Sequence, residues 1–158
     1  MDKTQPPRSF GVFKPTGYTV IAFASEQEAD AAFEALLQRG FDPHATVRYT
    51  PAEMQAQVRS DLQTASPFAA VGQELNLVRA HGDLAAAGAH FIVAPTSDTQ
   101  SLEKVREILS LGGVLAAQRY GAFIIEDLVG DARGNTQSFE SPDRGLDLDT
   151  QPDAPEVR

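Results

Sequence analysis

A glutamate and a histidine, Glu74 and His81, lie seven residues apart in a stretch whose apolar residues have helical spacing. At about 100° per residue, both fall almost on one line of the helix, between two apolar strips. A carboxylate and an imidazole there could form a buried pair, an acid–base couple or part of a metal site. They are ~10 Å apart along the axis, so one metal ion could not readily bridge them. Because charged residues are usually exposed, the simpler interpretation is a strip that faces solvent.

The dipeptide Arg-Tyr ends two predicted strands, as Arg48-Tyr49 and as Arg119-Tyr120. The arginines are candidates for anion binding, and the tyrosines could hydrogen-bond a ligand at the sheet. Side chains alternate along a strand, so the structural alternative is that each tyrosine packs on the sheet while its arginine points to the opposite face. A lone histidine at a strand end, such as His90, is more often structural or solvated than a ligand.

Signatures of known catalytic and cofactor sites are missing from the sequence. It contains no GxGxxG or GxxxxGK[ST] phosphate loop and no GxSxG nucleophile elbow. It has no cysteine, which excludes disulfides, thiolate zinc sites and thiol catalysis. We therefore predict no catalytic residue, no cofactor and no metal. The candidate ligand-binding residues are Glu74, His81, His90, Arg48, Tyr49, Arg119 and Tyr120.

Composition limits the partners of the chain. The formal net charge is −9 at pH 7, which argues against nucleic-acid binding and against docking to an anionic membrane. The N-terminal residues MDKTQPPRSF lack the apolar segment of a signal peptide. No stretch approaches the ~18 apolar residues of a membrane span. We expect a cytoplasmic protein.

The ends of the chain differ in composition from its centre. Residues 1–17 are rich in proline and glycine and read as a flexible arm, although Phe10, Val12 and Phe13 could pack on another part of the protein. Residues 131–158 carry seven acids against three arginines and read as a disordered acidic tail. The apolar content, 42% over the whole chain, is sufficient for one folded domain, which we place at 18–130.

Periodicity within 18–130 predicts alternating strands and helices. The apolar runs 18–25 and 89–95 are typical of strands covered on both faces. The more polar segments 44–50 and 114–120 are further predicted strands. Segment 122–129 either continues the last strand or pairs with it as a hairpin. Capping signals and apolar stripes predict helices that begin near Ser25, Thr50, Ser66 and Ser97.

The order strand, capped helix, glycine stop, strand occurs twice at a nearly constant offset. Residues 72 apart match before the glycine stops, and residues 71 apart match after them: Ser25 and Ser97, Glu28 and Gln100, Gly40 and Gly112, Arg48-Tyr49 and Arg119-Tyr120. Two tandem βαβ units predict a ferredoxin-like α+β fold with an inserted helical hairpin at about 51–88. The first and third strands would be central, and the second and fourth would be the edges.

The two central strands are apolar on both faces, so the second face of the sheet needs a cover. The inserted helices could supply it, or a second subunit could pack sheet to sheet. We therefore predict a homodimer.

The order of elements and the segment SPFAAVGQELNLVRAHGDLAAAGAHFIVAP resemble small bacterial proteins of unknown function, remotely similar to the heat-induced general stress protein (YflT-like) domain. The resemblance covers about 18–95 and implies a stress-linked, non-catalytic role, with no functional residue to carry over. We predict a non-enzymatic cytoplasmic binding or regulatory module for a small-molecule ligand or a protein partner. The alternative is a cofactor-independent enzyme of the dimeric α+β-barrel type, in which two sheets enclose a cavity.

Overall fold

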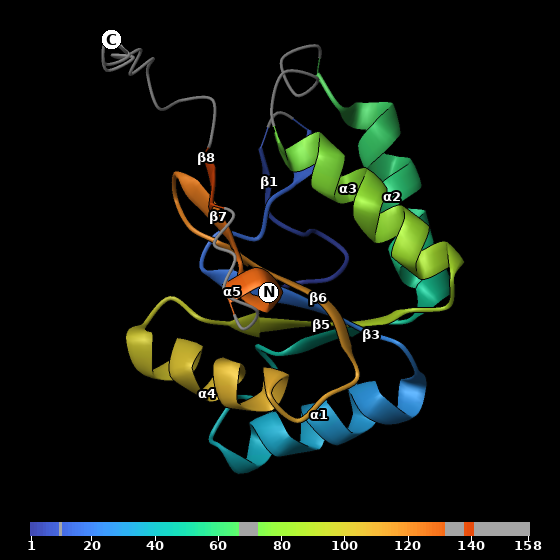
Figure 1. Cartoon of the computed structure of the whole chain (residues 1–158). Helices are drawn as coiled ribbons and strands as arrows, with labels where there is room; N and C mark the ends of the chain where they lie inside the picture. Colours follow the sequence, from blue (N-terminus) through green and yellow to red (C-terminus); the bar gives the residue numbers. More distant parts are fainter. Residues whose placement is uncertain (10, 67–72, 132–137, 141–158) are drawn as a thin grey trace, which may run out of the picture.

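The main sheet has six strands among the residues that the structure describes. The computed structural model describes residues 1–9, 11–66, 73–131 and 138–140 (Figure 1). In chain order the strands of this sheet are β3 (Tyr18–Phe23), β4 (Val47–Tyr49), β5 (His90–Pro95), β6 (Val114–Tyr120), β7 (Ile124–Asp127) and β8 (Ser138–Glu140). Their order in space is β4-β5-β3-β6-β7-β8, and every neighbouring pair is antiparallel. The prediction of an α+β fold is confirmed at this level.

The helices of the described ranges connect or follow these strands: α1 (Glu26–Gln38), α2 (Pro51–Thr64), α3 (Gln73–Ala86), α4 (Thr99–Leu109) and the short α5 (Leu128–Asp131). Ser25 caps α1, and its hydroxyl accepts the backbone N–H of Glu28. Thr50 begins α2 with a full capping box. The cap of α4 is Asp98, one residue later than predicted, because the carboxylate accepts the N–H of Ser101. The predicted start of α3 lies partly outside the described residues.

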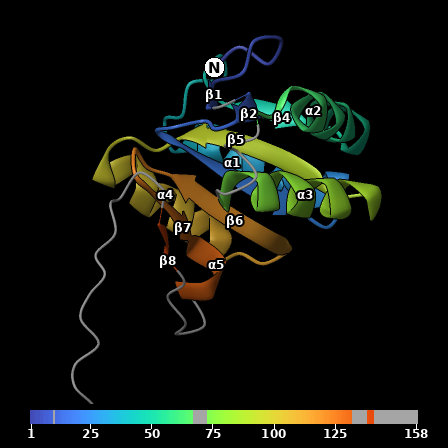
Figure 2. The ribbon, with the colours of Figure 1, turned by 90° about the horizontal axis from the view of Figure 1, so that it is seen from above.

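Two helical layers enclose the sheet (Figures 1 and 2). Helices α1 and α4 cover one face, where they bury the side of β3 and β5 that carries Ile21 and Ile92. Helices α2 and α3 cover the other face, which carries Val20 and Val93. The inserted hairpin is therefore one cover of the second face. The second sheet face therefore does not need a second subunit to cover it. The alternative of an α+β-barrel enzyme requires an open sheet face, and this face is covered.

The N-terminal segment differs from the predicted flexible arm, because it completes this second layer. Strands β1 (Arg8–Ser9) and β2 (Val12–Phe13) form a small antiparallel hairpin against α2 and α3. Val12 is fully buried and Phe13 is 2% exposed. The two side chains extend the apolar core on this face of the sheet.

The fourth strand of the predicted repeat is not an edge strand, which corrects the prediction. The segment after Gly121 turns back and forms β7, whose Asp127 pairs with Gln118 of β6. Strand β4 does lie at an edge, as predicted. Part of the predicted acidic tail, Ser138–Glu140, forms β8 beside β7. Residues 132–137 and 141–158 lie outside the described part of the chain.

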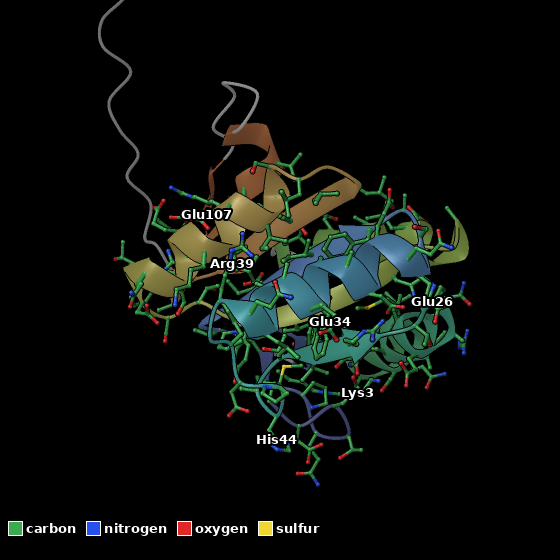
Figure 3. All side chains as sticks on the ribbon, turned by 90° about the horizontal axis from the view of Figure 1, so that it is seen from below. Lys3, Glu26, Glu34, Arg39, His44 and Glu107 are labelled. Atoms are coloured by element: carbon green, nitrogen blue, oxygen red, sulfur yellow. The ribbon has the colours of Figure 1, made fainter. Side chains whose placement is uncertain are left out.

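Helices α1 and α4 lie side by side on the outer face of the sheet, where an ion pair joins them. Arg39, which follows α1 directly as its C-cap, donates to Glu107 of α4 over 3.2 Å (Figure 3). Both side chains are partly exposed, so this pair contributes little to stability. In the described ranges, no helix combines the length and the apolarity that a transmembrane span requires.

Candidate functional site

The two tyrosines of the repeated dipeptide are core residues. Tyr49 and Tyr120 point to the face covered by α2 and α3, and both are almost fully buried. The ring of Phe13 packs edge-on against each of them, with centroid distances of 6.4 Å to Tyr49 and 6.4 Å to Tyr120. Both tyrosines of the dipeptide therefore pack on one residue of the N-terminal hairpin.

The two arginines belong to separate places. Arg48 forms an ion pair with Asp30 of α1, and its guanidinium lies over the ring of Phe33 at 5.2 Å. Arg119 donates to the carbonyl of Thr96 over 3.3 Å and to Glu126 over 3.4 Å. Their strands are separated by β5 and β3, which corresponds to ~14 Å at ordinary strand spacing. The structure does not bring these arginines together.

Glu74 and His81 are buried, which corrects the interpretation that their strip of α3 faces solvent. Glu74 is 9% exposed and pairs with Lys14 over 3.0 Å. His81 is 2% exposed, and its Nε2 lies 3.1 Å from the side-chain oxygen of Gln118. The N-terminal segment and β6 supply these partners. The periodicity of the helix alone could not show that either would pack against it.

Burial sets the protonation state of His81. The loss of solvent lowers the pKa of this imidazole, while the hydrogen bond to Gln118 acts in the opposite direction. The imidazole ring also packs edge-on against the ring of Phe91, with 5.8 Å between the ring centroids. Glu74 and His81 are thus both buried and have different partners. Among the residues that the structure describes, no three His, Asp or Glu side chains are grouped to hold a metal ion.

Three of the predicted residues meet in one pocket. Strand β4 ends and β5 begins at the same end of the sheet, where the starts of α1 and α2 also lie. The hollow there has a volume of about 310 Å³, which is within the range of small-ligand sites. We call it the β4-end pocket, and it is lined by Lys3, Glu26, Ala29, Arg48, Tyr49, Thr50, Glu53, His90 and Phe91.

The β4-end pocket carries balanced charge. Its lining holds two bases, Lys3 and Arg48, and two acids, Glu26 and Glu53. Lys3 pairs with Glu53 over 2.7 Å, and both side chains are more than a third exposed. The pocket can therefore present a cation and an anion to the same bound molecule, after modest movement of exposed side chains. His90 adds a partly exposed imidazole with no hydrogen bond to any described residue.

Tyr49 forms the inner wall of this pocket, and its hydroxyl is buried without a hydrogen-bond partner in the described part of the chain. Burial, together with the nearby charges of Asp61, Glu53 and Asp2, raises the pKa of this phenol to about 12. The hydroxyl is therefore a neutral donor at physiological pH. Lys3 lies over the same ring, 5.1 Å from its centroid.

Replacement of Tyr49 by phenylalanine should stabilise the protein. An unsatisfied buried hydroxyl costs roughly 1–3 kcal/mol, and Tyr49→Phe removes it while the ring remains packed on Phe13. We expect the free energy of unfolding, measured by urea titration, to rise by about 1 kcal/mol or more. Tyr18→Phe, at a half-exposed position, is the control and should change it little. A loss of stability in Tyr49→Phe would show that the hydroxyl has a partner in solution.

Sequence reasoning missed the residues that complete the pocket. Glu53 carried a signal, because the capping box at Thr50 placed it at the start of α2, but that signal describes a helix end and not a site. Lys3 carried none, since its contribution depends on how the N-terminal segment folds over Tyr49.

Comparison of the chain with protein-family models, with curated protein sequences and with solved structures finds no match. The resemblance to the YflT-like domain therefore stays a prediction, and the site must be interpreted from its geometry.

Proposed function

We propose that this chain is a non-enzymatic binding module that holds a small zwitterion in the β4-end pocket. The observation that carries the proposal is the lining of that pocket by two bases and two acids around a volume of about 310 Å³. A ligand of one charge sign would meet like charges on the wall, whereas a zwitterion can turn each end toward its opposite. The class that fits is a free α-amino acid or a molecule with the same two charged groups.

The proposed contacts follow from the placement of the charges. The carboxylate of the ligand would face Arg48 and His90, at the side where β4 and β5 meet. Arginine binds a carboxylate through two parallel hydrogen bonds, which requires Arg48 to turn from Asp30. The ammonium group would face Glu26, which has no ion-pair partner among the described residues.

The test compares matched ligands by calorimetric titration of the full chain. The ligands are L-α-amino acids, and each is tested beside the carboxylic acid that lacks its amine and the amine that lacks its carboxylate. We expect binding only of the complete zwitterion. Arg48→Ala should weaken it about 10- to 100-fold, the effect of losing a charged hydrogen bond.

The control for this titration is Arg106→Ala, which removes an exposed arginine from α4, on the opposite side of the molecule from α2. It should leave the affinity unchanged. Binding of the carboxylic acid alone with equal affinity, or equal weakening by both arginine variants, would contradict the proposed site.

We also propose that the main sheet is a duplicated βαβ arrangement of the ferredoxin-like type. Its support is the spatial order of the first four strands of this sheet: second, third, first and fourth in the chain. Each half has the form strand, helix, strand: β3-α1-β4 and β5-α4-β6, with α2 and α3 inserted between the halves. Strands β7 and β8 extend the arrangement beyond the plain fold.

The homodimer, the cytoplasmic location and the stress-linked role stay predictions. A dimer would now need an interface other than the second sheet face, which α2, α3 and β2 cover.

A further inference from the structure

The N-terminal segment is attached firmly at one end and weakly at the other, and the weakly attached end lies at the β4-end pocket. The firm end is the hairpin of β1 and β2. The weak end is residues 1–5, which precede the hairpin and which we call the N-terminal tip. The contrast between the two ends indicates which part of the segment can move.

The hairpin is anchored to α2 by hydrogen bonds and by one close backbone approach. The amide of Phe13 donates to the buried carboxylate of Asp61 over 3.2 Å, and the hydroxyl of Thr64 donates to the carbonyl of Gly11 over 2.7 Å. Gly11 has a φ of +82°, and a β-carbon there would overlap the carbonyl oxygen of Thr64. Since Val12 and Phe13 are also buried in the core, the hairpin is a fixed point.

The tip is held by contacts that solvent reaches. Lys3 pairs with Glu53 over 2.7 Å, and the exposed fractions of the two side chains are 35% and 46%. Such a pair adds little to stability, because water and salt screen it. The Lys3 ammonium group also lies over the ring of Tyr49, and Met1 packs on the core while it stays partly exposed. These contacts favour a closed position of the tip without fixing it.

The tip has a shape of its own, and two prolines connect it to the anchor. The amide and the hydroxyl of Thr4 both donate to the carboxylate of Asp2, over 2.8 Å and 2.7 Å, which closes a turn. Pro6 and Pro7 follow, and proline restricts the backbone around it. A turn that moves as a unit about a short, stiff connection loses little conformational entropy when it closes.

Lys3 is the residue through which the tip lines the β4-end pocket. Its ammonium group has three donors, so it can keep Glu53 and still donate to the carboxylate of a ligand. A bound zwitterion would add a contact that exists only when the tip is closed, and would shift the tip toward that position. We propose that the N-terminal tip is a lid on the β4-end pocket and that the Lys3–Glu53 ion pair is its latch. The inference rests on the proposed function for the ligand that the lid encloses.

The lid is tested without ligand by the distance between two spin labels in the full chain. Because the protein has no cysteine, labels can be attached at Gln5→Cys in the tip and at Ala56→Cys, an exposed position on α2. We expect two distance populations, one short and one long. High salt and Lys3→Met should each increase the long population, since both weaken the latch. Lys104→Met, on α4, is the control and should leave the populations unchanged.

Two glycine variants test the anchor. Gly11→Ala should disperse the short distance, because the hairpin can then no longer pack against Thr64. Gly88→Ala, just after α3, is the matched control: Gly88 has a similar φ of +94°, but a β-carbon there would meet nothing within 4 Å. It should leave both populations in place. Circular dichroism confirms that each variant is folded.

Binding kinetics connect the lid to the pocket. A lid slows both entry and exit, so Lys3→Met should raise the association and the dissociation rate constants of the amino acid that binds most tightly. We expect the dissociation rate constant to rise about fivefold or more, the effect of losing an exposed ion pair. A rise in the dissociation rate constant alone would make Lys3 a contact residue and not a latch.

Two further results would overturn the proposal. One is a single short distance that neither salt nor Lys3→Met changes, because the tip would then be a fixed wall. The other is a single broad distribution in the protein with Lys3 unchanged, because the tip would then have no closed position. Neither result depends on a ligand. Failure of every amino acid to bind, with both distance populations present, would instead contradict the proposed function.

Discussion

Replacement of Phe13 by alanine should lower the free energy of unfolding by about 3–5 kcal/mol, the cost of deleting a buried aromatic ring. Phe13 is 2% exposed, and the centroid of its ring lies 6.4 Å from the ring centroid of Tyr49 and 6.4 Å from that of Tyr120. The surrounding sheet and helices are close-packed, so the cavity would not collapse fully. The measurement is urea unfolding followed by circular dichroism, since the chain has no tryptophan.

The same measurement on Phe123→Ala provides the matched control. Phe123 is 62% exposed in the turn between β6 and β7, so its loss should change stability by less than about 0.5 kcal/mol. If the two variants lost similar amounts, the N-terminal hairpin would not be packed on α2 and α3 in solution. The proposed pocket, whose wall includes Lys3 of that segment, would then be incomplete.

The second large effect that we expect is a loss of folding stability as the pH falls, caused by His81. His81 is buried, and its pKa in the folded state is below the value of 6.5 that it has when unfolded. Below pH 6.5 the unfolded chain therefore takes up a proton that the folded chain resists. The stability from a neutral His81 is complete above that pH and is lost as the pH falls. We expect a loss of up to about 1.4 kcal/mol per pH unit from this group.

The variant His81→Gln tests this, because glutamine can still bond to Gln118 but does not titrate in this range. The difference between the two pH profiles isolates His81 from Asp61, whose pKa is raised by burial and which therefore favours the folded state as the pH falls. His44→Gln, at an exposed position before β4, is the control. Parallel profiles for the unmodified protein and His81→Gln would show that His81 is solvated.

The sequence was sufficient for the elements that have strong local signals. The hydroxyls of Ser25 and Thr50 cap α1 and α2 as predicted, because capping depends on a few adjacent residues. Apolar runs placed β3 and β5, since strands covered on both faces need apolar residues at every position. The hairpin partner of β6 was one of two open alternatives, because the turn at Gly121 is compatible with both.

Long-range contacts account for the errors. Residues 1–17 look unstructured by composition, yet Val12 and Phe13 fill a space that exists only after α2 and α3 pack on the sheet. From the sequence alone Glu74 is predicted to be exposed, because its ion pair with Lys14 depends on how residues 1–17 fold. Of the candidate site residues, Arg48, Tyr49 and His90 meet because β4 and β5 are neighbours, which depends on sheet order and not on spacing in the sequence.

The most direct measurement of the central claim is an NMR titration of the ¹⁵N-labelled full chain with the α-amino acid that binds most tightly. If the β4-end pocket is the binding site, the amide signals of Arg48, Tyr49, Thr50 and His90 will shift together and saturate at the calorimetric affinity. Signals from Arg119, near the other end of the sheet, will not move. The proposed function would be contradicted if no amino acid shifts the pocket signals, or if the shifts gather on another surface.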